Sequence, residues 1–398
     1  MFLYDIIKVI YSPIKAFREI LENPRYIGPA IIIIISLLLT VGTQYVSVSK
    51  HYVEAITPST RAAWTNMTDP STMWTSNGTV ANILVTSNIT IGTYSVITSI
   101  HNNSEIWLKT TNIGTINCSE DSGFKALYYK LMYVSVQSQN LTTATLRLYS
   151  FKNEGNYFKF DLLSSERYLN KSVAWIDANV TLVSGWTVGG GSPDWSNITG
   201  IEFRLNFPKN DTLSLQLNDL YFGGKYESWF DALGSSDWLI NTLMSSIFDI
   251  FLRWLIFAAL LWLTIKTFNP EGGQFKTLLI IVGYSFAIML VYIPFNMLSI
   301  SQLPALHFPH RVVFPASARE TELANTATSN IYAANWSSTT PYMVYFGISI
   351  ASYIWTVGLF TIALKTLKNF SWKKSLAMGL IAWLMGWVLL NIVSSLGF

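Results

Sequence analysis

Two kinds of residue are scarce in this sequence: cysteine and charged side chains. The 398 residues include one cysteine, so Cys118 has no partner within the chain and an intramolecular disulfide is excluded. Charged residues make up 12% of the sequence, whereas soluble domains contain about 25%. The formal net charge of +3 is too small to indicate a nucleic-acid-binding protein. This composition is typical of a membrane protein.

Catalytic and metal-binding motifs are scarce as well. The sequence shows no Ser/His/Asp or Cys/His set and no pair of carboxylates that suggests an acid/base cleft. The glycine run 189–191 leads into a proline turn rather than a helix, so it is not a phosphate-binding loop. The motif HFPH at 307–310 is too tightly spaced and too rich in proline for a metal site. We therefore predict a protein that is not an enzyme and holds no cofactor or metal; a surface hydrolase is the least favoured alternative.

Five apolar stretches are long enough to cross a bilayer, which takes about 20 residues in a helix. They are 27–48, 247–268, 278–300, 342–364 and 376–396. Residues 1–25 carry scattered charges, which predict a surface amphipathic helix rather than a cleaved signal peptide. The sequence thus predicts a polytopic α-helical membrane protein with one transmembrane helix in 26–48 and four in 241–398. Residues 49–240 form a large insertion, and 301–341 form a second loop.

Lysine and arginine residues near the ends of the stretches predict their orientation, because short cytoplasmic segments are enriched in both. The N-terminal segment, 265–277 and 365–374 are basic, whereas the loop 301–341 has only Arg311 and Arg319. We therefore expect a multi-pass plasma-membrane protein whose N-terminus is cytoplasmic. Its C-terminus and residues 49–240 are then extracellular.

Sequons for N-linked glycosylation, Asn-X-Ser/Thr, support the same orientation. Residues 51–235 contain ten, whereas the asparagine, serine and threonine content would give about 4 by chance. The predicted glycosylation sites, with one in the second loop, are Asn66, Asn77, Asn88, Asn102, Asn117, Asn140, Asn170, Asn179, Asn197, Asn210 and Asn335. Asn369 also fits the pattern, but it lies in a predicted cytoplasmic turn and is expected to stay unmodified.

Three pieces of the apolar half resemble the Yip1 domain family. The first is YSPIKAFREILENPRYIGPAIIIIISLLL, in which Ser12 and Pro13 open a surface helix that Asn23 and Pro24 end. The others are GGQFKTLLIIVGYS and IWTVGLFTIALKTLKNFSWKKSLAMGLIAWLMGWVLL. Their order and the five spans fit that family, and the large insertion departs from it. Eukaryotic members act in membrane traffic with small GTPases, whereas prokaryotic members mostly have no established activity. The resemblance therefore implies a fold and a topology rather than a reaction.

The insertion has a β pattern from residue 125 onwards. In TGIEFRLNF the apolar residues Ile201, Phe203, Leu205 and Phe207 alternate with polar ones, and TLSLQLNDLYF repeats the pattern. A period of two predicts strands with one buried face. Further candidate strands are ALYYKLMYVSVQS, TATLRLYSF, NYFKFDLL and SVAWIDANVTLV, so an all-β sandwich or jelly roll is expected. The less regular residues 51–124 would supply the first strands or a stalk.

The end of the insertion resembles a known type of β domain. The segment DWSNITGIEFRL followed by LQLNDLYFGG is similar to galactose-binding-like jelly rolls, which are common in carbohydrate-binding modules. Trp186 and Trp195 are candidates for stacking on a sugar ring, because an indole face is large and apolar. The favoured interpretation is that Trp195 packs at the edge of the sandwich, just before a strand. Asp194 and Asp219 have the hard oxygen ligands that calcium prefers, but isolated turn aspartates are more common, so no structural calcium is expected.

Asp249 and Arg253 are four residues apart in the second apolar stretch, and so they lie on one helix face. An ionisable residue within a span is a functional candidate by default. Both lie toward the outer end, where an arginine side chain reaches the interface. A self-satisfied intramembrane ion pair is therefore favoured over an ion or proton path.

These observations favour a non-enzymatic membrane scaffold or cell-surface recognition protein that displays a glycosylated β-sandwich. Its predicted partners are the lipid bilayer and surface glycans, a surface-layer protein or other membrane proteins. The alternative is a transporter or permease subunit, which a polar cavity through the spans would support. The low charge of the insertion suits a hot or acidic exterior, and an archaeal envelope is the predicted setting.

Overall fold

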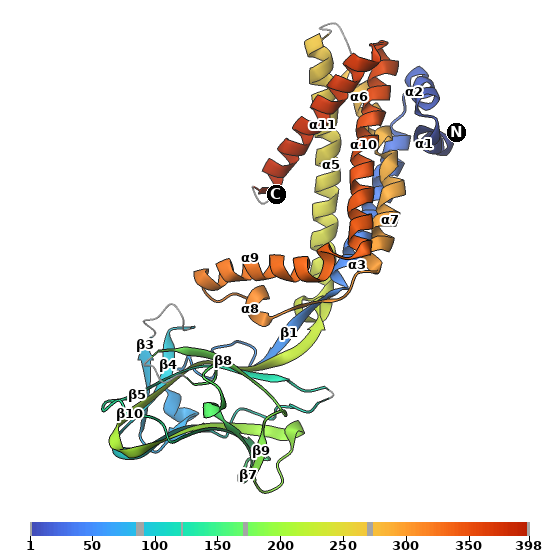
Figure 1. Cartoon of the computed structure of the whole chain (residues 1–398). Coiled ribbons are helices and arrows are strands. Elements are labelled where there is room, and N and C mark those ends of the chain that lie inside the picture. The colour runs from blue at the N-terminus through green and yellow to red at the C-terminus, as the bar shows by residue number, and fades with distance from the viewer. Residues whose placement is uncertain (1, 85–90, 121, 170–173, 269–273, 396–398) are drawn as a thin grey trace. The chain divides into compact units, whose positions relative to one another are not determined.

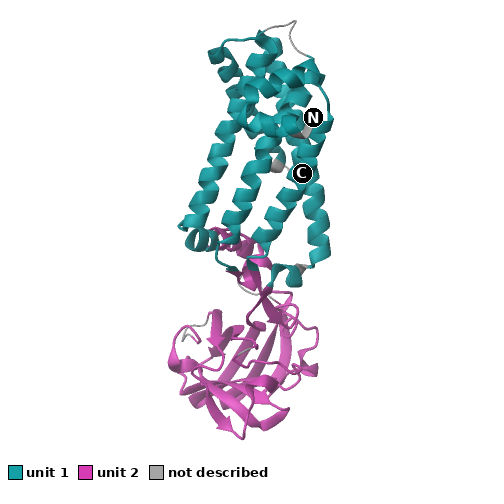
Figure 2. Ribbon diagram, turned by 90° about the vertical axis from the view of Figure 1, so that its right-hand side faces the viewer, with its two compact units in different colours: residues 1–51, 228–306, 331–398 teal, residues 52–227, 307–330 magenta. Residues whose placement is uncertain are grey.

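The computed structural model describes residues 2–84, 91–120, 122–169, 174–268 and 274–395. The chain forms two compact units, each built from segments that are distant in the sequence (Figure 2). The first, here called the membrane unit, contains 1–51, 228–306 and 331–398. The second, the β-unit, contains 52–227 and 307–330. Residues 307–330 therefore belong with the insertion, although the sequence suggested a separate loop.

The membrane unit has five helical segments that are long and apolar enough to cross a bilayer, as predicted. They are α3 (Ile27–Val48), α5 (Ser235–Phe268), α6–η4–α7 (Phe275–Ser285, Phe286–Ile288 and Met289–Ser301), α10 (Thr340–Lys368) and α11 (Trp372–Ser395). Figure 1 shows α5 and α10 running lengthwise with α3 and α7. Helix α5 has 34 residues and begins at Ser235, well before residue 247, where the apolar stretch that predicted it starts. The third segment is interrupted by the 3-10 turn η4, and α7 contains Pro294.

Short helices accompany the spans. Two precede the first span, α1 (Phe2–Tyr11) and α2 (Pro13–Glu22), and an ion pair between Lys8 and Glu19 joins them. Pro13 begins α2, where a missing N–H costs nothing. Ala16, Phe17 and Ile20 form the buried face of α2, so α2 is amphipathic as predicted. The sequence predicted one helix in residues 1–25, whereas the structure has two. The connections into α5 and α10 contain α4 (Trp229–Leu233) and η5 (Ala333–Ser337).

The β-unit is an antiparallel sandwich organised by two long strands, β4 (Tyr94–Thr110) and β10 (Ile198–Ser228), which pair with each other. The first half of β10 also pairs with β6, β6 pairs with β7, and β7 pairs with β9. The second half of β10 pairs with β5, and β5 pairs with β8. Their bounds are β5 Ala126–Ser135, β6 Thr143–Ser150, β7 Asn153–Asp161, β8 Ile176–Thr181 and β9 Thr187–Gly190. Register shifts between Asn206 and Leu213 separate the halves, so one strand serves both layers. The sequence predicted two strands here.

The core of the β-unit lies between these layers. Phe203, Leu205, Leu215 and Leu217, all predicted to be inward-facing, are fully buried. Residues 51–124 supply first strands rather than a stalk. The remaining elements are β1 (His51–Thr57), η1 (Pro70–Thr72), β2 (Thr75–Ser76), β3 (Thr79–Leu84), η2 (Leu162–Ser164), η3 (Trp195–Asn197), β11 (Leu306–Phe308), α8 (His310–Val313) and α9 (Ala318–Tyr332).

Candidate functional site

A buried ion network centres on Asp219 in β10. Its side chain is fully buried, and its backbone has a φ of 52°. The carboxylate accepts hydrogen bonds from Arg61 Nε at 3.0 Å and Arg61 Nη2 at 2.6 Å. The Oδ2 atom of Asp219, which accepts the bond from Arg61 Nη2, also lies 3.2 Å from Lys130 Nζ and 3.3 Å from Arg311 Nη2. Three cations therefore surround one carboxylate, and a buried site requires further negative charge to balance them.

Glu320, in α9, supplies part of that balance. Both of its carboxylate oxygens accept hydrogen bonds from Arg61, each at 2.9 Å. Burial alone would raise the pKa of Glu320, but the hydrogen bonds from Arg61 and the Ala316 amide, together with the nearby positive charges, lower it to about 2. A cap helps to place this residue, because the Glu320 amide donates to Ser317 Oγ at 3.2 Å. Serine followed three residues later by glutamate is a helix-start signal, and it could have predicted α9 although the sequence analysis treated 301–341 as a loop.

Asp177, in β8, completes the balance. Arg311 Nη1 donates to its two carboxylate oxygens at 2.7 and 2.6 Å, and Arg311 Nε donates to Tyr221 Oη at 2.8 Å. Three basic groups and three acidic groups thus neutralise one another. The guanidinium of Arg311 is held in a fixed orientation from two sides.

A cavity of about 400 Å³, here called the α9 cavity, opens beside the network. Its charged and polar lining consists of Lys130, Asp177, Arg311, Ser317, Arg319 and Glu320, and its apolar lining of Trp175, Val312, Leu323, Ala324 and Ala327. A few oriented polar groups set against an apolar wall are typical of a site for a small ligand. The sequence did not predict this site.

The two aspartates considered for calcium serve separate roles. Asp194 caps η3 and accepts hydrogen bonds from the Ser196 amide at 2.8 Å and from Ser196 Oγ at 2.6 Å. Asp219 faces three cations, an environment that repels a calcium ion. Within the described residues, no group of three or more His, Cys, Asp or Glu side chains is arranged to hold a metal. His307 stacks on Tyr52, whereas the amide of His310 donates to Glu54, so the histidines of HFPH make separate contacts.

Trp186 and Trp195 do come together at one edge of the sandwich. Their rings meet edge to face with centroids 5.6 Å apart, and both are half-buried against the core. Trp195 stacks on Phe158 at 3.9 Å, whereas Trp186 Nε1 donates to the Thr181 carbonyl oxygen at 3.0 Å. The stacking gives Trp195 the packing role that was favoured. Trp186 keeps part of its surface open beside it.

Asp249 and Arg253 form the predicted ion pair in α5. Arg253 Nε lies 2.8 Å from both carboxylate oxygens of Asp249, and each side chain is 45% exposed. Arg253 lines a cavity of about 280 Å³ whose other polar lining residues are Tyr292, Ser352, Tyr353, Thr356 and Asn391. Asp249 lines another, of about 260 Å³, together with Thr40, Gln44, Ser245 and Ser246. Each member of the pair thus borders a polar cavity, which the sequence did not predict.

Four of the five candidate spans lie in the part of the chain that matches a known family. The model of the Yip1 domain matches residues 180–393, which is more than half of the chain. The chain belongs to the Yip1 domain family. It is a multi-pass membrane protein of that family with a large β insertion after the first span. No curated protein sequence matches it.

Solved structures similar to this Yip1-family chain include a carbohydrate-binding module and a cleaved adhesin domain. A family 11 carbohydrate-binding module of Clostridium thermocellum is 12% identical and covers 38% of this chain and 86% of its own, with a TM-score of 0.26. The K2 cleaved adhesin domain of Lys-gingipain is 16% identical and covers 42% of this chain and 99% of its own, with a TM-score of 0.25. Similarity at this level carries no implication for what the β-unit binds.

The predicted glycosylation sites differ in how accessible their side chains are. Asn88 and Asn170 lie outside the described residues. The exposed asparagines are Asn66, Asn102, Asn117, Asn140, Asn179, Asn210 and Asn335, whereas Asn77 and Asn197 are half-buried. Asn77 is tied to β4 through both side-chain atoms: Nδ2 donates to the Glu105 carbonyl oxygen at 2.8 Å, and Oδ1 accepts from the Trp107 amide at 3.0 Å.

Proposed function

We propose that this Yip1-family protein is a non-enzymatic membrane scaffold that displays its β-unit outside the cell, where the unit recognises a surface glycan, a surface-layer protein or another membrane protein. The observation that supports recognition is the α9 cavity. Its charged groups are oriented by ion pairs within the β-unit, so a ligand finds them already in place. Binding groups that are ordered beforehand lower the entropic cost of association.

The composition of the cavity favours a ligand that has both an acidic group and an apolar face. The lining contains three basic and two acidic side chains, and a quarter of the Arg311 side-chain surface is exposed to solvent. Trp175 offers an aromatic surface suited to a sugar ring or an apolar side chain. The extracellular position of the unit rests on the sequons and on the basic segments 265–277 and 365–374.

The test is ligand capture by the full-length protein in detergent, on a glycan array and in a pulldown from envelope extract. Trp175→Ala and Arg319→Gln should each weaken binding of the captured ligand by about 1–3 kcal/mol, whereas Lys159→Gln, an exposed change on β7, should leave it unaltered. If Trp186→Ala weakens binding and Trp175→Ala does not, the binding site lies at Trp186 instead. If the folded protein captures nothing, the recognition role is wrong.

Transport is a second candidate, and the polar cavities beside Asp249 and Arg253 favour it. Ionisable residues that border polar cavities within spans are typical of ion and proton pathways. Proton flux into proteoliposomes, followed with a pH-sensitive dye, distinguishes the two functions. Flux that Asp249→Asn abolishes would support transport, and equal flux in protein-free vesicles would exclude a proton path.

A further inference from the structure

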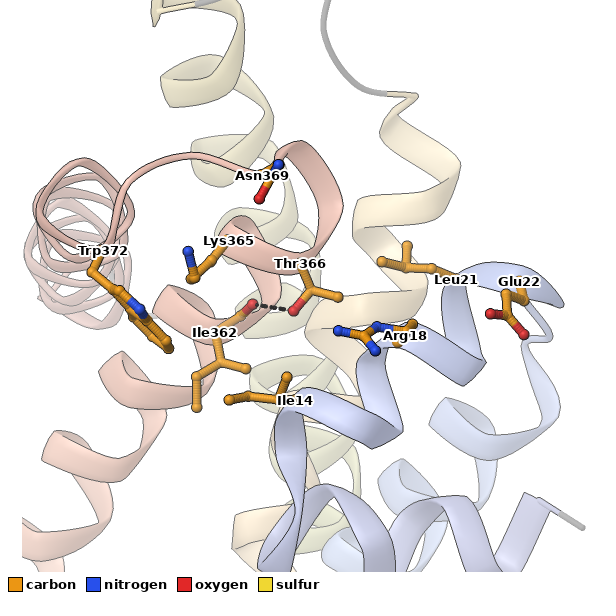
Figure 3. A pocket seen from close by; sticks show the side chains of 9 residues that line it. All are labelled: Ile14, Arg18, Leu21, Glu22, Ile362, Lys365, Thr366, Asn369 and Trp372. Carbon is orange, nitrogen blue, oxygen red and sulfur yellow. Dashed lines mark hydrogen bonds between the residues drawn. The ribbon is translucent and has the colours of Figure 1, made fainter.

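The membrane unit has another cavity, at the place where α2, the end of α10 and the start of α11 meet (Figure 3). Its volume is about 360 Å³. The residues that line it are Ile14, Arg18, Leu21 and Glu22 from α2, Ile362, Lys365 and Thr366 from α10, Asn369 at the end of α10, and Trp372 at the start of α11. We call it the α2–α10 pocket.

The turn between α10 and α11 sets the position of Lys365. Asn369 ends α10 with a left-handed φ of 51°, and the chain then returns so that Trp372 lies beside the last turn of the helix. The Lys365 ammonium lies 4.9 Å from the centroid of the Trp372 ring and 3.4 Å from the Phe370 carbonyl oxygen. The helix dipole also favours a positive charge at this end of α10.

Two basic side chains of the pocket are available to a ligand. In Figure 3 the Arg18 guanidinium points toward Ile362 and Thr366, while Glu22 lies farther along α2. Within the described residues, neither Arg18 nor Lys365 forms an ion pair with a carboxylate, in contrast to Lys8 with Glu19. The turn 365–374 contains four lysines and no acidic residue. The two basic side chains outnumber the one acidic lining residue, Glu22, so the pocket carries a net positive charge.

The remainder of the lining is apolar and partly open. Ile14 is 44% exposed, and it lies with Leu21 and Ile362 next to the basic groups. The neighbouring helix α1 also exposes Tyr4, Ile7 and Tyr11 by more than half. Exposed apolar faces on short amphipathic helices are typical of helices that lie in the bilayer interface. A basic site next to an apolar lining, close to helices of the bilayer interface, suits a lipid. The phosphate would lie at the basic groups and the acyl chains against the apolar lining.

We propose that the α2–α10 pocket binds the phosphate headgroup of an anionic phospholipid. The planar guanidinium of Arg18 matches two phosphate oxygens, and Lys365 adds a point charge on the opposite side of the pocket. The first carbons of the acyl chains then lie against Ile14, Leu21 and Ile362. This site is in the membrane unit and does not depend on what the β-unit recognises.

The experiment is a titration of the full-length protein in neutral detergent with phosphatidylglycerol, followed by native mass spectrometry. The double variant Arg18→Gln/Lys365→Gln removes both pocket charges. The matched control Lys15→Gln/Lys373→Gln removes one charge from α2 and one from the same turn, but neither residue lines the pocket. We expect about 30-fold weaker lipid binding in the pocket variant, since each charge near an anionic headgroup contributes about fivefold. The lipid affinity of the control should remain within about threefold of that of the original protein, because exposed surface charges contribute little.

Three results would overturn the proposal. Equal loss in both double variants would indicate a diffuse basic surface, and no loss in either would exclude the pocket. Displacement of the lipid by an excess of inorganic phosphate would assign the site to free phosphate instead. The single variants Arg18→Lys and Lys365→Met are measured alongside, so that misfolding of the double variant does not decide the outcome: both should weaken lipid binding with unchanged melting temperature.

Discussion

Arg61 and Asp219 are 158 positions apart in the chain, yet their side chains form a two-point ion pair in the β-unit. The exposed fractions of the two side chains are 3% and 0%. The same guanidinium donates to Glu320, which comes from the segment between the third and fourth spans. The charge balance of the β-unit therefore depends on a part of the chain outside the insertion.

Removing the cation of this pair should destabilise the β-unit strongly. Arg61→Met removes the guanidinium that donates hydrogen bonds to both Asp219 and Glu320, which breaks a buried ion pair at a cost of about 3–5 kcal/mol. Lys109→Met is the control, because its partner Glu154 is 58% exposed and such surface pairs contribute about 0–1 kcal/mol. Unfolding of the purified protein in denaturant, followed by tryptophan fluorescence, compares them. Equal destabilisation by the two changes would mean that the buried network contributes no more than a surface pair.

The same network determines which fragment folds without the spans. A piece covering 80–235 contains every strand that the sequence predicted. It lacks Arg61, Arg311 and Glu320, so Lys130 is the one cation of the network that stays beside Asp219. We expect this piece to be unstable, whereas 52–227 joined to 307–330 by a flexible linker should fold. Cooperative thermal melting of the two fragments is the measurement. A cooperative transition in the shorter piece would show that the network is dispensable.

Stability should fall in acid through Glu320. Its pKa is lowered from 4.5 to about 2 in the folded state, so its ionised form stabilises the fold. That contribution is fully present above pH 4.5 and is lost as the pH falls toward 2. The melting temperature of the protein should therefore decrease in this window, and Glu320→Gln should be less stable at neutral pH and show a smaller decrease. If the variant has the same pH profile as the original protein, Glu320 is not the group that titrates.

The strands and spans were predictable from sequence because their signals are local. Phe203 and Leu215 lie in period-two patterns that a buried sheet face requires, and the spans are continuous apolar runs. The pairing of Asp249 with Arg253 was likewise set by a spacing of four within one helix. Such patterns need no knowledge of distant residues.

The ion network and the α9 cavity had no comparable signal. Asp219 resembles an isolated turn aspartate, and its partners come from segments that only the folded chain brings together. The continuity of β10 was missed for a related reason, since the segment 208–210 has the proline and asparagine of a turn. In the structure β10 passes through this segment with a register shift, and β4 pairs with β10 both before and after the shift.

Glycan occupancy should follow the accessibility of each asparagine. The exposed sites such as Asn66, Asn102 and Asn210 should be modified, and Asn77 should be occupied least, because its amide nitrogen is already bonded to β4. Asn369 should be bare if its turn is cytoplasmic. Mass spectrometry of glycopeptides from native membranes gives the occupancy of each site. A sugar on Asn369 would reverse the proposed orientation.

The two tryptophans at the sandwich edge should respond differently to truncation. Trp195 stacks on Phe158 at 3.9 Å, so Trp195→Ala opens a cavity in the packed edge at a cost of about 3–5 kcal/mol. Trp186 contacts Trp195 by its edge and donates one hydrogen bond to a strand carbonyl, so Trp186→Ala should cost less, about 1–2 kcal/mol. Denaturant unfolding of the two variants is the measurement, with Trp195→Phe as a control that retains a stacking ring. A side chain that stacks on a ligand contributes little to the core. If Trp186→Ala destabilised the protein as much as Trp195→Ala, Trp186 would be a core residue, and the structural basis for its stacking on a sugar ring would be lost.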